Sequence, residues 1–454
     1  MNEKSIEKIL CLRQPGGLFS RKPPPWTPSK SFLLFMCLFL VVPFLYGSQD
    51  NSQPAGSLVI IGGAIDTENG AVLQKFIELG GGKNNIRIAI IPAASASPVE
   101  SGTLYINDFQ QYGVPGDHIK VFPVAVMDDP ITKETNETGW SKNGFNKELA
   151  QEMLNYTAVF FVGGDQARYL ETLIDKDGND SPLLAAIRQV YEKGGVIGGT
   201  SAGAAIMSDP MICGGNSSDA MIKGAVYQPD TCPTEGGVFL TKGLGFFTFG
   251  LVDQHFIKRG RCGRLIAALL HLKNVTLGMG VDEDTAAIYN NKTKTIEVIG
   301  SSAILLVDTR DTLPAHPQPG TKIQNIILHY LEAGDMYFME TGKFTIHPER
   351  KKIETSKEYY KTYPLDTNIF GNDAIKEIIT SGLVDNQEKE SVGLAFTLDA
   401  KKKNISTSSG KGVKLVFKKG ELTAGYWARI KDKSTYSALY IYLDIIPISV
   451  KITE

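Results

Sequence analysis

Gly198-Gly199-Thr200-Ser201-Ala202-Gly203-Ala204-Ala205 is the most informative stretch of the chain. A short apolar run at 195–197 precedes it, and residues 204–207 are predicted to be helical. A strand, a sharp turn that holds a serine between glycines, and a helix make up the nucleophile-elbow pattern G-x-S-x-G. Small neighbours let Ser201 occupy a strained turn at a helix start, where developing negative charge is stabilised. Ser201 is therefore a candidate nucleophile, and the alternative is an ordinary Gly- and Ala-rich turn.

Strands and helices alternate on both sides of this stretch. Near-continuous apolar strands are predicted at 57–61, 86–91, 119–122 and 157–162. Such strands are typical of a sheet that is covered on both faces. The helix before the elbow is well marked, because Ser181 is a predicted N-cap followed by Pro182 at the first helical position. We therefore expect an α/β domain at 57–310 with a doubly wound, mostly parallel sheet.

In such sheets function gathers at the carboxyl ends of the strands. Three Gly-rich strand ends fall there, at 62–63, 163–165 and 198–200. Prolines then mark residues 311–340 as a linker or excursion. Residues 341–454 carry short alternating runs without a catalytic motif, so we expect a small β-rich C-terminal appendage that serves packing or attachment to a surface.

The N-terminal 56 residues differ from the rest. A basic tail broken by prolines precedes an apolar run at 32–46, which is short for a membrane span and typical of a signal-peptide core. We expect residues 1–56 to be a basic tail with a cleaved signal peptide or an uncleaved N-terminal anchor. The protein is then secreted or periplasmic, or tethered to a membrane through residues 32–46.

Composition narrows the chemistry. The chain has 454 residues, 42% of them hydrophobic and 21% charged, with a net charge of -2, so nothing global points to a nucleic-acid partner. Cys213 and Cys232 bracket a Gly-, Ser- and Pro-rich segment and could pair in an oxidising compartment, which leaves Cys262 as a packed free thiol. There is no C-x-x-C and no metal-ligand spacing, so we expect neither a metal nor a cofactor.

A serine nucleophile needs a base, an orienting acid and an oxyanion hole. Among six histidines, His255 stands out because polar residues flank it after an apolar strand. The cations that follow it, Lys258 to Arg264, are either a solvated basic turn or a pocket for substrate carboxylates, which arginine binds bidentately. The three acids at 282–284 are either a solvated turn or part of the site.

These pieces together resemble the serine peptidase family that holds the cyanophycinases and the aspartyl dipeptidases. The matching stretches are 163–166, 199–209, 253–256 with 259–265, and 280–285, and they follow the family's order over residues 57–310. The leader lies outside the match, and so do about 110 residues at the C-terminal end. The resemblance implies a fold like that of the class I glutamine amidotransferases, with a nucleophile elbow.

The resemblance also implies roles for individual residues. Ser201 would be the nucleophile and His255 its base, with Asp219 as the orienting acid and Glu283 as the second choice. Region 216–219 departs from the family pattern, which tends to carry a glutamate there. The backbone amides of Gly164 and Ala202 would form the oxyanion hole. The implied substrate-binding residues are Gln166, Asp253, Gln254, Arg259, Arg261 and Arg264.

The implied activity is that of an exported serine exopeptidase. It would hydrolyse cyanophycin, a polymer of aspartate carrying arginine on each β-carboxyl, to β-Asp-Arg dipeptides through an acyl-enzyme. Its arginines would pair with the substrate's carboxylates, and acids such as Asp253 would take its guanidinium groups. Two alternatives remain, namely an aspartyl or isoaspartyl peptidase on the same scaffold and a catalytically idle binding protein. A homodimer is a further expectation from the resemblance.

Overall fold

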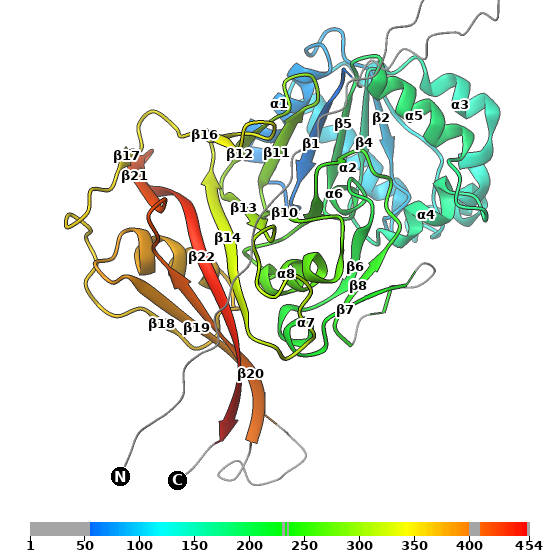
Figure 1. Cartoon of the computed structure of the whole chain (residues 1–454). Helices are drawn as coiled ribbons and strands as arrows, with labels where there is room; N and C mark the ends of the chain where they lie inside the picture. The colour runs from blue at the N-terminus through cyan, green and yellow to red at the C-terminus, as the bar shows by residue number, and fades with distance from the viewer. Residues whose placement is uncertain (1–54, 229–231, 234–235, 399–408, 452–454) are drawn as a thin grey trace, which may run out of the picture. The chain divides into compact units, whose positions relative to one another are not determined.

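A computed structural model describes residues 55–228, 232–233, 236–398 and 409–451. The predicted leader at 1–56 therefore lies almost wholly outside the described residues. The described residues form one compact unit. Two large sheets and one small sheet organise the described residues (Figure 1).

The first sheet has nine strands in the order β16-β15-β12-β11-β1-β5-β4-β2-β3. Its parallel half contains the predicted strands: β1 (Ser57–Ile61), β5 (Val196–Thr200), β4 (Ala158–Phe161), β2 (Ile88–Ile91) and β3 (Ile119–Val121). Its other half is antiparallel: β11 (Thr285–Asn290), β12 (Thr295–Gly300), β15 (Met336–Phe338) and β16 (Lys343–Thr345). The expectation of a mostly parallel sheet thus describes only the half that carries the elbow.

Helices cover both faces of the parallel half, as the continuous apolar strands predict. Along β1, Leu58 and Ile60 belong to one core cluster, whereas Val59 and Ile61 belong to another. The helices and short 3-10 helices of this region are η1 (Thr67–Asn69), α1 (Ala71–Leu79), α2 (Pro98–Gln111), η2 (Gly116–His118), η3 (Glu137–Phe145), α3 (Lys147–Met153), α4 (Ala167–Leu173), α5 (Pro182–Glu192) and α6 (Ala202–Ala205). The predicted cap of α5 is confirmed, because Ser181 Oγ accepts a hydrogen bond from the Leu184 amide at 3.2 Å.

The second sheet has ten strands and joins the two parts of the chain that the sequence separates. Its strands are β9 (Leu251–Asp253), β10 (Leu277–Val281), β13 (Ala303–Asp308), β14 (Ile323–Glu332), β17 (Lys351–Lys352), β18 (Leu365–Asp366), β19 (Glu390–Leu398), β20 (Ser409–Lys418), β21 (Ala424–Ile430) and β22 (Lys433–Lys451). The third sheet holds β6 (Met211–Gly215), β8 (Val238–Thr241) and β7 (Ala225–Tyr227).

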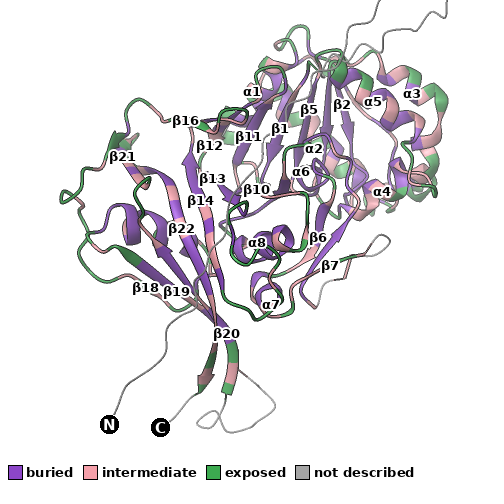
Figure 2. Cartoon of the chain, in the orientation of Figure 1, coloured by how far each residue is buried: buried purple, intermediate pink, exposed green. Residues whose placement is uncertain are grey.

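Residues 311–340 are not a linker, which corrects the sequence-based expectation. They contain β14, which pairs with β13 on one side and with β22 on the other. Figure 2 shows β14 and much of β22 as buried strands, and Leu328, Tyr330 and Leu443 are fully buried in one cluster. The C-terminal region is β-rich as predicted, but its strands continue the sheet that contains β9, β10 and β13 and do not form a separate appendage.

The remaining helices pack onto this second core. They are α7 (Ser217–Lys223), α8 (Cys262–His271), α9 (Ala374–Ile379) and a π-helical turn, η4 (Thr380–Val384). Cys262, at the start of α8, is a buried free thiol as expected, and burial raises its pKa to about 12. None of the helices in the described part of the chain has the length and hydropathy needed to cross a bilayer.

Candidate active site

Ser201 lies in a strained turn between β5 and α6. Its backbone has φ 53° and ψ −109°, in the region of positive φ that non-glycine residues seldom occupy. A Cβ at Gly199 would lie 2.2 Å from the Gly203 carbonyl oxygen, and a Cβ at Gly203 would lie 2.3 Å from that of Phe161. Only glycine fits at these two positions, so the pattern G-x-S-x-G follows from the packing of the elbow against β4.

His255 follows β9 and faces this serine. Its Nε2 lies 2.8 Å from Ser201 Oγ, within hydrogen-bond distance. Its own backbone amide donates to the Gly62 carbonyl at 2.8 Å. A Cβ at Gly63 would lie 2.3 Å from the imidazole Cε1, so the Gly62-Gly63 strand end leaves the space that the ring fills.

Glu283 holds the other side of the imidazole. Its Oε1 lies 2.6 Å from His255 Nδ1. The preceding residue, Asp282, fixes the turn between β10 and β11. Its carboxylate accepts hydrogen bonds from the Ile257 and Lys258 amides, both at 2.9 Å. The three-acid turn therefore belongs to the site, and Ser201, His255 and Glu283 form one continuous chain of hydrogen bonds.

Asp219, the first choice for the orienting acid, does not contact His255. It lies on α7, where its carboxylate pairs with Lys223 at 3.2 Å and accepts from the Asn216 side-chain amide at 3.2 Å. These contacts are local to one helix, whereas the position beside the imidazole is occupied by Glu283. The structure thus brings the second choice to the site and not the first.

The surroundings of His255 lower its pKa from the ordinary value of 6.5. Burial has the largest effect, because it penalises the charged imidazolium. The hydrogen bond to Glu283 raises the pKa, and the charges of Arg259 and Arg261 lower it. The imidazole is therefore neutral near pH 7, as a group that must accept a proton from a serine has to be.

The predicted oxyanion donors lie on the two segments that flank the serine. A Cβ at Gly163 would lie 3.2 Å from Ser201 Cβ, so the loop after β4 passes against the nucleophile. Gly164 has φ 139°, and a Cβ there would lie 2.1 Å from the Ala94 carbonyl oxygen. Within the described residues, the amides of Gly164 and Ala202 donate to no other protein group, which leaves both able to bind a substrate oxygen.

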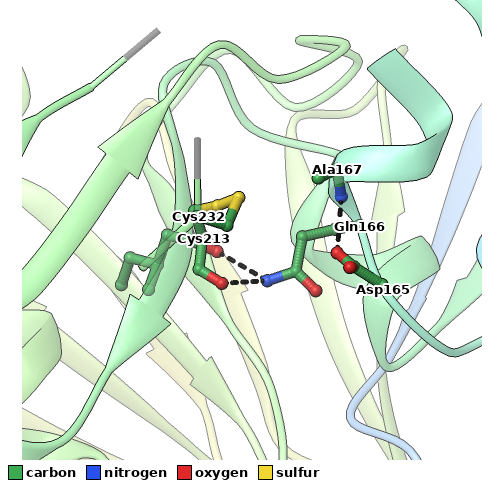
Figure 3. Close-up of a disulfide and its surroundings, with 6 residues drawn as sticks. Asp165, Gln166, Ala167, Cys213 and Cys232 are labelled. Atoms are coloured by element: carbon green, nitrogen blue, oxygen red, sulfur yellow. Dashed lines mark hydrogen bonds between the residues drawn. A yellow bond between two sulfur atoms is a disulfide. The ribbon is translucent and has the colours of Figure 1, made fainter. Parts of the chain in front are cut away.

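Gln166, predicted to bind substrate, uses its amide nitrogen inside the protein. Nε2 donates to the backbone carbonyls of Ile212 at 3.2 Å and Cys213 at 2.7 Å, and the residue is buried. Figure 3 shows this side chain pointing from the loop after β4 toward Cys213, which is joined to Cys232 by a disulfide. Gln166 therefore connects the loop after β4 to the disulfide-bonded segment.

Asp253 and Arg264 form a buried, two-pronged ion pair. Arg264 Nε lies 2.8 Å from Asp253 Oδ2, and its Nη2 lies 2.5 Å from Oδ1. The side chains are only 1% and 5% exposed, respectively. Asp253 is thus already paired with an internal guanidinium, which corrects the expectation that it takes a substrate guanidinium group.

The other two arginines differ in exposure. Arg261 is largely buried and donates to the Gln254 carbonyl at 2.7 Å and to its side-chain oxygen. Burial and the nearby Arg264 lower the pKa of Arg261 to about 9. Arg259 is 53% exposed and lies 3.6 Å from Glu283 Oε1. Of the predicted arginines, Arg259 is the one whose side chain is open to solvent beside the serine–histidine pair.

Two residues that support the site were not among the predicted site residues. Gly63 makes room for the imidazole, and Asp282 fixes the segment after His255. Both lie in stretches that the sequence pattern marks, a Gly-rich strand end and an acidic turn. The pattern therefore indicates these stretches but does not indicate what the two residues do. Across the described residues, no group of three or more His, Cys, Asp or Glu side chains is arranged to hold a metal ion.

Comparisons with known proteins find similar sequences. Residues 141–297 match the model of peptidase family S51. The chain is 36% identical over 293 residues to a cyanophycinase of Geminocystis herdmanii, across 63% of this chain and 94% of the relative. It is 34% identical over 301 residues to a cyanophycinase of Synechococcus elongatus, across 65% and 82%.

Solved structures are also similar. A peptidase from an acI-B1 Actinobacterium is 21% identical, with a TM-score of 0.42 over 63% of this chain and 98% of that one. A putative peptidase E protein from Listeria monocytogenes is 14% identical, with a TM-score of 0.32 over 54% and 99%.

Proposed function

Because the chain belongs to peptidase family S51 and is a serine-type peptidase, we propose that it hydrolyses cyanophycin and releases β-Asp-Arg dipeptides. The observation that carries the proposal is the chain of hydrogen bonds from Ser201 Oγ through His255 to Glu283, at 2.8 and 2.6 Å. The curated relatives named cyanophycinase support the choice of substrate.

The proposed reaction is a two-step acyl transfer. Ser201 Oγ attacks the peptide carbonyl carbon while His255 Nε2 takes the hydroxyl proton, and the amides of Gly164 and Ala202 bind the resulting oxyanion. His255 then gives the proton to the leaving amine, which departs and leaves an acyl-enzyme on Ser201. A water molecule, deprotonated by His255, releases the acid product and restores the serine.

Glu283 is the proposed orienting acid. With its carboxylate 2.6 Å from Nδ1, it holds the proton on that nitrogen, so Nε2 presents its lone pair to Ser201. It also stabilises the imidazolium that forms when the proton is taken. Asp282 and Gly63 act as positioning residues, because they hold the ring and its segment in place.

The proposed substrate contacts follow the exposure of the arginines. Arg259, open to solvent beside Glu283, is placed to bind a carboxylate of the substrate. Arg261, which donates a hydrogen bond to the Gln254 carbonyl, would form part of the pocket wall and contribute its positive charge there. Arg264, Asp253 and Gln166 would shape the pocket through their internal bonds and not through free polar groups.

Export is part of the proposal. The apolar run at 32–46 suits a signal peptide or anchor. The disulfide between Cys213 and Cys232 supports the same view, since disulfides persist mainly in oxidising compartments. We infer that the enzyme acts outside the cytoplasm, either free or tethered by its leader.

The test is incubation of the purified protein with insoluble cyanophycin, followed by mass spectrometry of the soluble fraction. Release of β-Asp-Arg by the wild type, and none by Ser201→Ala, is the expected result. Labelling with a fluorophosphonate probe, which reacts with activated serines, is run in parallel on both proteins.

The combined outcomes separate the alternatives. A labelled serine without release from the polymer would discard cyanophycin and direct attention to aspartyl and isoaspartyl peptides. Absence of both labelling and release would mean a catalytically idle binding protein.

A further inference from the structure

The turn that bears Glu283 also borders a pocket built partly by the C-terminal region. The pocket has a volume of about 560 Å³, within the usual range of small-ligand sites. One part of its lining, Asp66, Asp284 and Ser301, comes from residues 57–310, which contain the candidate active site and are called the catalytic half below. Another part is Lys431, in the turn that joins β21 and β22, and Lys433, the first residue of β22.

The catalytic half of this pocket is joined directly to the active site. Asp284 is the residue after Glu283, and its amide donates to the Gly63 carbonyl at 2.8 Å. The Asp66 amide in turn donates to the Asp284 carboxylate at 2.9 Å. The same two strand ends therefore hold the imidazole of His255 and present Asp66 and Asp284 to the pocket.

The C-terminal part is held rigidly. Ile430 pairs with Lys433, so Lys431 and Asp432 form a two-residue hairpin turn. Both have positive φ, at 46° and 62°, as a type I′ turn requires. This turn type fits the twist of the two strands and fixes the direction in which the lysines leave them.

A buried ion pair anchors the base of the hairpin. Arg350 Nη1 lies 2.6 Å from Asp335 Oδ1 and 3.2 Å from Ser437 Oγ, and Arg350 Nε donates to Thr435 Oγ1 at 3.2 Å. Alternate residues of a strand share a face, so Lys433 lies on the same face of β22 as Thr435 and Ser437. The anchored face is therefore the one that lines the pocket.

Two charged residues of the lining, Glu332 and Arg350, are buried and lie 3.9 Å apart, so they pair inside the protein. The remaining charged residues of the lining lie on different elements. Lys431 and Lys433 are exposed, and within the described residues neither ammonium lies within ion-pair distance of an acid. The acids Asp66 and Asp284 stand on the catalytic loops. A ligand with a carboxylate and a cationic group on one short arm matches this arrangement, because ammonium groups bind carboxylates and carboxylates bind guanidinium groups.

From this arrangement we propose that the pocket binds an arginine arm of the polymer next to the unit being cleaved, with Lys431 and Lys433 on the arm's α-carboxylate and Asp66 and Asp284 on its guanidinium. The inference rests on the proposed function for the identity of the substrate. It assigns to the β21–β22 hairpin, which lies beyond residues 141–297, a part in substrate selection.

The test measures binding without turnover, by titration calorimetry on Ser201→Ala. The probe is a soluble oligomer of three β-Asp-Arg units. Adding Lys431→Ala and Lys433→Ala should weaken binding by about tenfold, whereas Lys431→Arg with Lys433→Arg should retain it. Lys389→Ala with Lys411→Ala removes the same charge from exposed sites of the C-terminal region outside the pocket and should leave binding unchanged.

A second oligomer, with agmatine in place of arginine, lacks the α-carboxylate and isolates its contribution. Its binding should be insensitive to the two lysine changes, while Asp66→Asn should weaken both oligomers. Lysine changes that leave the arginine oligomer unaffected, or that weaken both oligomers equally, would overturn the assignment, as would failure of Ser201→Ala to bind the arginine oligomer.

These outcomes are separate from those that test the proposed function. Lysine-dependent binding of the arginine oligomer by a protein that releases nothing from cyanophycin would reject the hydrolysis and retain the pocket. Release of β-Asp-Arg with lysine-independent binding would do the reverse.

Discussion

Glu283 and Asp219 compete for one role, and the distances around His255 separate them. Glu283 lies 2.6 Å from Nδ1, whereas Asp219 is engaged with Lys223 and Asn216 on α7. Glu283→Gln keeps the shape but removes the charge that orients and stabilises the imidazole, so kcat should fall by on the order of 10³–10⁴-fold. Steady-state hydrolysis of the β-Asp-Arg oligomer measures it.

Asp219→Asn is the matched control. It neutralises an acid whose contacts are confined to its own helix, so kcat/KM should stay within about twofold of wild type, as is usual for exposed ion pairs. A large loss in Asp219→Asn with little change in Glu283→Gln would contradict the assignment of the acid.

The charge of Arg259 should be visible in the pH dependence of the reaction. Only neutral His255 can accept the serine proton, so kcat/KM should rise as the pH rises through its pKa, which lies below 6.5. Arg259 lowers that pKa. In Arg259→Gln the pKa of His255 should therefore rise, and the acid limb of the profile should move to higher pH.

This prediction concerns the pH at which the acid limb lies and not the maximum value of kcat/KM. The maximum can change for another reason, since Arg259 is also proposed to bind substrate. Lys258→Gln is the comparison, because the Lys258 ammonium pairs with Asp373 at 2.7 Å instead of acting on His255. A limb that stays in place, or moves to lower pH, in Arg259→Gln would refute the electrostatic account.

Among elements, β6 shows how a local crosslink supports the site. The disulfide joins Cys213 on β6 to Cys232, 19 residues later, and Gln166 links the Cys213 carbonyl to the loop after β4. Closing a loop of this length restricts the unfolded chain. The double variant Cys213→Ser with Cys232→Ser should therefore lose about 3 kcal/mol of unfolding free energy, measured by urea denaturation.

Wild type in the presence of a reductant is the control for this element. It should lose the same stability as the double variant, whereas the double variant should not respond to the reductant. Equal unfolding free energies for the oxidised wild type and the double variant would show that the crosslink contributes nothing.

At the scale of the whole molecule, β14 joins the two halves in one sheet. It pairs with β13 of the catalytic half and with β22 of the C-terminal region, and the three share one buried core. Unfolding either half would expose Leu328 and Tyr330, which are fully buried. We expect both halves to unfold in a single transition.

Tryptophan fluorescence can follow each half. Trp140 lies in η3 of the catalytic half and Trp427 in β21 of the C-terminal region. The sequence has a third tryptophan, Trp26, so both variants are made in a Trp26→Phe background. In that background Trp427→Phe and Trp140→Phe report on one half each. For each variant, the denaturant midpoint from fluorescence should coincide with the midpoint from far-UV circular dichroism of the same sample. Two separated transitions would mean that the C-terminal region folds independently.

The sequence by itself determined the features that neighbouring residues encode. The elbow at Ser201, the cap of α5 and the apolar strands of the parallel half follow from spacing and residue size over a few positions. His255 could be selected because few histidines exist and one follows an apolar strand among polar residues. These features depend on residues close together in the sequence, so they can be predicted without knowledge of the fold.

Only the tertiary structure decided which distant groups meet. Glu283 reaches His255 because β10 and β11 place their turn beside Gly63, and Asp253 is paired inside the protein because α8 brings Arg264 against it. Likewise, the prolines near 314–319 suggested a linker or excursion, although the strand that follows them is buried between β13 and β22. Such pairings depend on register and packing between segments far apart in the chain, which no local pattern contains.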